Sequence, residues 1–89
     1  MLEKHILFGI HVTDRVHRAG AVQEVLTKYG CSIKTRIGLH DTDDRKCSSS
    51  GVILLEMFGD EATCHEMADT LAEIEGVEVQ NMIFEHEED

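Results

Sequence analysis

The sequence of 89 residues lacks any apolar run approaching the roughly 18 residues that a membrane span needs. It also lacks a basic segment followed by an apolar one near its start, which is the pattern of a secretion signal. Its three cysteines are an odd number, and this argues against a disulfide framework. We therefore expect a cytoplasmic protein with reduced thiols and no membrane partner.

Basic residues are scarce, because eight Lys and Arg stand against 18 Asp and Glu, for a net charge of −10. A surface this acidic repels phosphate backbones, so we expect no direct contact with nucleic acid, and any link to transcription would run through another protein. Proline and tryptophan are absent, yet 42% of the residues are apolar, which is enough for the core of one domain over residues 1–89. A domain of this size is marginally stable alone and gains from a partner.

Motifs of catalysis and cofactor binding are absent as well. The sequence has no phosphate-binding loop and no GxGxxG, CxxC, HxH or HExxH spacing. The serines at 48–50 do not sit in the strand–Ser–helix elbow of hydrolases. The sequence therefore favours a protein that is not an enzyme and has no resident cofactor.

What the chain does contain is an internal repeat. Displaced by 46 positions, the distance from Asp14 to Asp60, it aligns with itself without a gap, and Gly30 falls on Gly76. In each half an apolar run ends at an Asp, a helical pattern follows, a Gly closes it, and an alternating run comes next. This order predicts two strand–helix–strand halves.

In the first half we expect a strand over 6–12, a helix capped at Thr13 or Asp14, and a left-handed closing residue at Gly30. Residues 32–40 alternate between apolar and polar, which is typical of a half-buried strand near a sheet edge. The predicted helix buries one stripe of side chains at three- and four-residue steps. That stripe consists of Val16, Ala19, Val22, Leu26 and Tyr29.

In the second half we expect a mobile polar loop over 41–50, an apolar strand over 51–58, and a helix capped by Asp60 and closed by Gly76. A last strand over 77–83 precedes an acidic, solvated tail over 85–89. The core stripe of this helix consists of Cys64, Met67, Ala68, Leu71 and Ile74.

The element order predicts an α+β fold of the ferredoxin-like βαββαβ kind, a four-stranded antiparallel sheet with two helices on one face. Right-handed crossovers place the strands over 6–12 and 51–58 at its centre. Both strands are apolar on both sides, although two helices cover only one side. We therefore expect a second copy of the chain on the other face or on an edge, with Val52, Leu54, Lys34 and Arg36 at the contact. Glu56 interrupts the apolar pattern either as a solvated carboxylate or as an interface or ligand carboxylate.

Several stretches of the chain resemble one known family: 12–15 (VTDR), 33–38 (IKTRIG), 52–55 with Asp60 beyond, Leu71, and 76–79. The sequence resembles the iron-only hydrogenase system regulators, small ACT-like domains similar to the C-terminal domain of the nickel-responsive repressor and to amino-acid-binding ACT domains. The resemblance implies a non-enzymatic regulator that forms homo-oligomers, dimers or tetramers, through its sheets, with a small-molecule effector or a protein partner.

The resemblance also implies where an effector binds. ACT domains usually hold it near the loop between the first strand and first helix, which corresponds here to His11, Thr13, Asp14 and Arg15. The usual ACT loop contains a glycine at this point, and this loop has none.

Two alternatives remain open at the level of the sequence. One is a nickel or zinc sensor, in which the loop over 41–50 brings His40, Asp41 and Cys47 together at a subunit interface, since all three are ordinary ligands of such ions. The other is a small enzyme of the dimeric-barrel type that uses His11 and Glu56 on the open face of the sheet.

Overall fold

The computed structural model describes residues 2–43 and 46–87, and the side chains of residues 4–38 and 50–85. Helices and strands alternate in the order βαββαβ, as predicted. Their bounds are β1 Leu2–Val12, α1 Arg15–Lys28, a 3₁₀ turn Gly30–Ser32, β2 Ile33–Asp43, β3 Lys46–Met57, α2 Glu61–Ala72 and β4 Val77–Glu87.

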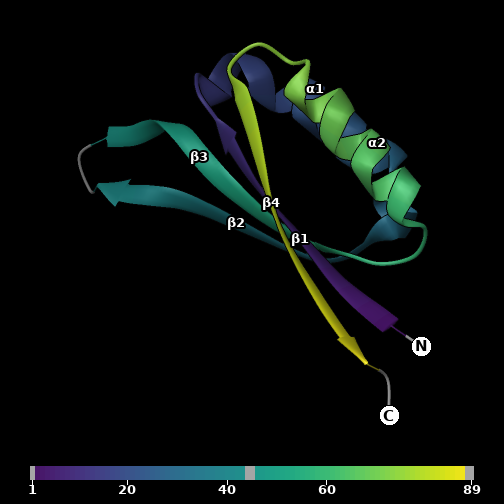
Figure 1. The fold of residues 1–89 in the computed structure, drawn as a ribbon. Helices are drawn as coiled ribbons and strands as arrows, with labels where there is room; N and C mark the ends of the chain where they lie inside the picture. Colours follow the sequence, from purple (N-terminus) through teal and green to yellow (C-terminus); the bar gives the residue numbers. More distant parts are fainter. Residues whose placement is uncertain (1, 44–45, 88–89) are drawn as a thin grey trace.

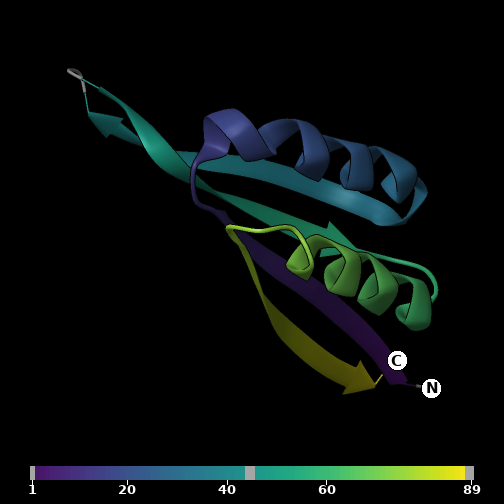
Figure 2. The same cartoon turned by 90° about the horizontal axis from the view of Figure 1, so that it is seen from above.

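The four strands form one antiparallel sheet in the order β2-β3-β1-β4, so β1 and β3 lie at its centre. Both helices lie side by side on one face of this sheet, with α1 along β2 and β3 and α2 along β1 and β4 (Figures 1 and 2). This arrangement confirms the predicted ferredoxin-like fold. Each crossover helix returns to the same face because both connections have the same hand.

The core lies between the helices and one face of the sheet. Side chains alternate along a strand, so β1 turns Ile6, Phe8 and Ile10 toward the helices and Leu7 away from them. The helices supply Val22 and Leu26 from α1, and Cys64, Met67 and Leu71 from α2, much as the predicted stripes require.

Val16 and Ala19 are the exceptions, because both are exposed, Val16 over 82% of its surface. Val16 lies six positions before Val22, and at about 100° per residue this places the two side chains roughly 120° apart around α1. The prediction that Val16 and Ala19 belong to the buried stripe is therefore wrong.

The helix ends follow the predictions in the second half more closely than in the first. The Asp60 carboxylate accepts a hydrogen bond from the Ala62 amide at 3.3 Å and caps α2. Gly76 has the expected positive φ of 83°. Gly30 does not have a positive φ, because the chain tightens there into the 3₁₀ turn that follows Tyr29.

Asp14 stands at the start of α1 but does not cap it with its side chain. Its carboxylate instead contacts Nδ1 of His17 at 2.8 Å, and its backbone is left-handed, with φ 55°. This contact with His17 engages both oxygen atoms that a cap would use. Thr13 provides no cap either, since no side-chain bond of this kind is formed at α1.

The loop predicted over 41–50 is largely strand. β2 continues to Asp43 and β3 begins at Lys46, with Thr42 opposite Cys47, and an irregularity lies between His40 and Thr42. Strand pairing uses backbone N–H and C=O groups, and these can form hydrogen bonds whether the side chains are polar or apolar. The paired ends of β2 and β3 project beyond the helices as a two-stranded ribbon (Figure 1).

The predicted acidic tail over 85–89 is also shorter than expected. β4 runs to Glu87, which lies opposite Leu2 at the end of β1, and residues 88–89 lie outside the described part of the chain. The start of β1 and the end of β4 therefore lie side by side (Figure 1).

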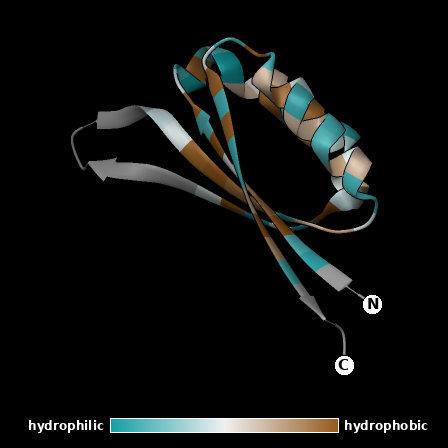
Figure 3. Cartoon of the chain, viewed as in Figure 1, coloured by the Kyte–Doolittle hydropathy of each residue, from teal (hydrophilic) through white to brown (hydrophobic). Residues whose placement is uncertain are grey.

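The second face of the sheet carries no helix and is apolar over much of its width. Leu54 lies opposite Gly9 on β1 and Ile37 on β2, and Met82 lies opposite Leu7. Ile37, Leu54, Met82 and Phe84 are 50%, 40%, 57% and 53% exposed. Figure 3 shows the hydrophobic stretches along the strands. The helix-free side of β3 is apolar at Val52 and Leu54, as predicted, whereas that of β1 carries His5, Gly9 and His11 beside Leu7, so the prediction holds for β3 and not for β1. No helix in the described ranges is both long and apolar enough to cross a membrane.

Candidate functional site

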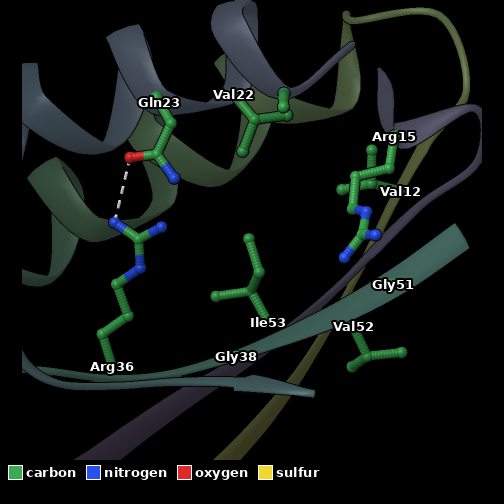
Figure 4. A pocket seen from close by; sticks show the side chains of 10 residues that line it. Val12, Arg15, Val22, Gln23, Arg36, Gly38, Gly51, Val52 and Ile53 are labelled. Atoms are coloured by element: carbon green, nitrogen blue, oxygen red, sulfur yellow. Dashed lines mark hydrogen bonds between the residues drawn. The ribbon is translucent and has the colours of Figure 1, made fainter. Parts of the chain in front are cut away.

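A groove of about 180 Å³ lies between α1 and the strands β2 and β3. Its lining is largely apolar and includes Val12 and Ile53 from the strands and Val22 from α1. Gly38 and Gly51 keep the strands free of side chains there and leave the groove open. Figure 4 shows Arg36 rising from β2 at one end and Arg15 descending from α1 at the other, with Val22 and Ile53 between them.

Arg36 reaches the groove because of an irregularity in β2. Ile33 lies opposite Met57, but Thr35 lies opposite Glu56, so one extra residue, Lys34, is inserted between them. Arg36 consequently stands on the helix-covered face.

The Arg36 side chain is held by α1. Its Nη1 donates a hydrogen bond to Oε1 of Gln23 at 3.1 Å (Figure 4). The sequence pattern placed Arg36 on a polar face at a subunit contact, whereas this bond directs it across the groove to the helix.

Arg15 is the first residue of α1, where the helix dipole also places partial positive charge. Guanidinium groups stay charged at all physiological pH values. Among the side chains that the structure describes, the ion pairs involve other residues, and no carboxylate pairs with Arg15 or Arg36. The groove therefore combines an apolar lining with two positive charges that are not paired with any carboxylate among the described side chains, although the chain as a whole carries a net charge of −10.

Of the four residues predicted to bind an effector, only Arg15 lines this groove. His11 lies on the opposite face of the sheet, in a shallower hollow of about 170 Å³ with Glu78 and Gln80. The Thr13 amide donates to the carbonyl of Gly76 at 2.8 Å, and Asp14 is engaged by His17.

Sequence reasoning missed Gln23 as a groove residue. It sits one position after the buried Val22, and nothing in the helical pattern distinguishes it from the exposed residues around it. Its position opposite Arg36 follows from packing between elements far apart in the sequence.

Glu56 lies on the helix-free face of the central strand β3, not at an edge. Its carboxylate is half-buried and lies 3.7 Å from Nδ1 of His5 and 3.9 Å from Nζ of Lys34. Leu7 lies opposite Glu56 and His11 opposite Val52. At roughly 3.3 Å per residue, this register separates Glu56 and His11 by about 13 Å along the strands. The two residues of the enzyme hypothesis are thus too far apart to act on one atom within one chain.

The predicted metal ligands lie in the paired ends of β2 and β3. Cys47 lies opposite Thr42, and His40 lies opposite Gly51. The side chains of His40, Asp41 and Cys47 lie outside the part of the structure that is described. Within the described residues, no group of three His, Cys, Asp or Glu is arranged to hold a metal ion. Nickel or zinc binding at His40 and Cys47 stays a prediction.

No model of a protein family matches the chain, and no curated protein matches it either. Solved structures, by contrast, do match the chain. An uncharacterized protein from Thermotoga maritima has a TM-score of 0.76 and 26% identity over 91% of this chain and 98% of its own.

Two further structures resemble the chain at lower identity. CPII from Thiomonas intermedia K12, a nitrogen regulatory PII-like protein solved with ADP, AMP and acetate, has a TM-score of 0.59 and 9% identity over 99% of this chain and 93% of its own. A dimeric ferredoxin-like protein from an uncultured marine organism has a TM-score of 0.56 and 10% identity over 97% of each chain. Together these structures define the class to which the fold belongs, the small ferredoxin-like domains.

Proposed function

We propose that this chain is a non-enzymatic regulatory module of the cytoplasm that senses a small ligand and works as a homo-oligomer, a dimer or tetramer assembled through the helix-free face of its sheet. The observation that carries the proposal is the set of four large apolar side chains exposed on that face: Ile37, Leu54, Met82 and Phe84.

The assembly part of the proposal follows from the cost of leaving such a face in water. Monomers rarely expose continuous apolar patches of more than a few hundred Å². Leu54 and its half-buried neighbour Val52 are at the middle of the face, and Lys34, 61% exposed, lies toward its β2 edge. A second copy would cover the apolar centre and leave charged side chains at the rim, as interfaces usually do. That a protein of the same fold is dimeric supports this arrangement.

The sensing part rests on the groove at Arg15, Gln23 and Arg36, and on the helix-free hollow at His11. The groove offers charged hydrogen-bond donors beside apolar side chains, as binding sites for small molecules do. A PII-like protein of the same fold, solved with nucleotides and acetate, supports a small ligand. Thr13 and Asp14 take part by positioning the start of α1.

The finer assignment, a regulator associated with the iron-only hydrogenase system, is supported by the sequence resemblance alone. In that role the acidic chain acts on transcription through a protein partner, because its charge opposes direct contact with DNA. A strain that carries both the gene and such a hydrogenase tests it: deletion of the gene changes hydrogenase transcript levels if the assignment is right and leaves them unchanged if it is wrong.

Light scattering coupled to gel filtration, on untagged and chelator-treated protein, tests the assembly. We expect a dimer or tetramer that Leu54→Asp dissociates to a monomer, because a carboxylate would be buried in an apolar contact. Val16→Asp is the matched control, since Val16 is also an exposed apolar side chain but lies on α1, outside that face. A monomeric wild-type protein, or equal masses for all three, contradicts the assembly. A screen of metabolites by thermal shift tests sensing, and a screen in which nothing stabilises the protein contradicts it.

A further inference from the structure

We propose that the groove between α1 and the strands β2 and β3 binds a short aliphatic dicarboxylate, with one carboxylate on Arg15 and the other on Arg36. The inference rests on the proposed sensing function and specifies the ligand that the function leaves open. It assigns the binding to one groove within a single chain, distinct from the apolar face where copies would meet.

The spacing of charge in the groove points to two anionic groups and not to one. Arg15 and Arg36 come from different elements and stand at opposite ends of the cavity, with Val22 and Ile53 between them (Figure 4). A ligand with a single carboxylate would pair with one guanidinium and leave the other without an anionic partner. Two carboxylates joined by methylene groups match both charged ends and the apolar middle.

The donors at each end fit a carboxylate. A guanidinium presents N–H groups in a planar fork that bonds both oxygens of a carboxylate. At the Arg36 end, Gln23 accepts from Nη1 through Oε1, which holds the guanidinium toward the groove and leaves the Gln23 amide N–H groups as additional donors. The first turn of α1 adds its positive end beside Arg15.

The size of the groove and the charge of the protein further restrict the class of ligand. At about 180 Å³ the cavity is smaller than the roughly 300 Å³ at which sites for drug-sized ligands begin, so a nucleotide would not be enclosed by it. An inorganic oxyanion could pair with one arginine but would not use the apolar lining. The net charge of −10 repels a dianion elsewhere on the surface, so binding depends on these two arginines.

Isothermal titration at low ionic strength, with succinate, glutarate and adipate, tests the proposal. Butyrate and sulfate serve as the anions that lack, respectively, the second carboxylate and the methylene chain. We expect a dicarboxylate to bind with a stoichiometry of one per chain. It should bind more tightly than butyrate or sulfate. Arg15→Gln and Arg36→Gln should each weaken binding by about 10- to 100-fold, since each removes a charged hydrogen-bonded contact. Lys28→Gln, the same change of charge elsewhere on α1, should leave the affinity unchanged.

Three outcomes overturn the proposal: no dicarboxylate binds at millimolar concentration, sulfate or butyrate binds as well, or the arginine variants bind normally. Circular dichroism checks that each variant is folded, and Arg36→Lys, which keeps the charge but not the fork, should bind with intermediate affinity. Failure here is distinguishable from failure of the proposed function. If dicarboxylates do not bind while Leu54→Asp still dissociates the oligomer and another metabolite stabilises it, the ligand assignment is wrong and the regulatory module stands.

Discussion

The backbone N–H of Thr13 donates a hydrogen bond to the carbonyl oxygen of Gly76 at 2.8 Å. This bond joins the end of β1 to the turn before β4. Gly76 has a φ of 83°, and a Cβ atom at this position would lie 3.1 Å from the Thr13 carbonyl oxygen. The close approach and the left-handed backbone both require glycine.

Gly76→Ala should therefore lower the free energy of unfolding by about 1–3 kcal/mol, the usual range for a strained left-handed residue. Urea denaturation at a fixed protein concentration measures it. Gly20→Ala is the control, because Gly20 lies inside α1 with open space around it. That change should raise stability by about 0.5–1 kcal/mol. Equal effects of the two substitutions would show that the Gly76 turn is not constrained as described.

The Cys64 thiol should be unreactive in the folded protein. It is fully buried in the core, and this burial raises its pKa, with a smaller contribution from the nearby charge of Asp60. The thiolate is the reactive form, so the raised pKa and the lack of access act in the same direction. Cys31, by contrast, is exposed. Iodoacetamide at neutral pH should modify Cys31 in the native protein and Cys64 only after denaturation, as read by peptide mass spectrometry. Rapid native labelling of Cys64 would contradict the packing of α2.

The ion pair between Lys4 on β1 and Glu61 on α2 should be visible in the titration of the glutamate. Lys4 Nζ lies 2.9 Å from Glu61 Oε2, and its hydrogen bond lowers the pKa of Glu61, while the same bond raises the pKa of Lys4. The contribution of the pair to stability is thus present at neutral pH. It is lost as pH falls through the lowered pKa of Glu61 or rises through the raised pKa of Lys4.

Lys4→Met should consequently move the pKa of Glu61 upward, as followed by carboxyl NMR. Lys28→Met, which removes a cation that lies over the Tyr29 ring, should not move it. The idea fails if Glu61 titrates identically in all three proteins.

The metal-sensor hypothesis makes its own prediction. If His40 and Cys47 are ligands, chelator-treated protein should bind Ni²⁺ or Zn²⁺ tightly and in fixed stoichiometry, and His40→Ala and Cys47→Ser should each abolish this binding. His65→Ala is the control, since His65 lies on α2 beside Glu61, away from the ends of β2 and β3. Weak binding that survives both ligand substitutions would rule out these residues as a metal site.

The architecture was largely predictable because the relevant signals are local. Period-two alternation over 32–40, three- and four-residue steps in Cys64, Met67 and Leu71, and the cap at Asp60 each depend on neighbours within a few positions. The order of these elements, with right-handed crossovers, then leads to the sheet order. Local reasoning failed where a competing local contact existed, as with the Asp14–His17 pair, or where a backbone partner extended a polar segment, as in the ribbon of β2 and β3.

The candidate site was predictable only in part. Arg15, which lines the groove, was among the residues that the resemblance to ACT domains implied, but Gln23 was not named, and Arg36 was assigned to a subunit contact. The reason is the extra residue in β2 near Lys34, which shifts the register against β3. A shift of one residue exchanges the two faces of a strand, and no periodicity within the strand itself reveals it.

By itself, then, the sequence determined the repeated halves, the fold class, most of the core stripes and the apolar character of both sides of β3, because each follows from the spacing of residue types along the chain. The tertiary structure alone decided which face the helices cover, and that Leu54 and Met82 remain in the open. It also decided that Arg36 meets Gln23 across the groove while His11 faces the other way. Those outcomes depend on register and on packing between distant segments, which are set by the free energy of the whole fold and not by any one stretch of it.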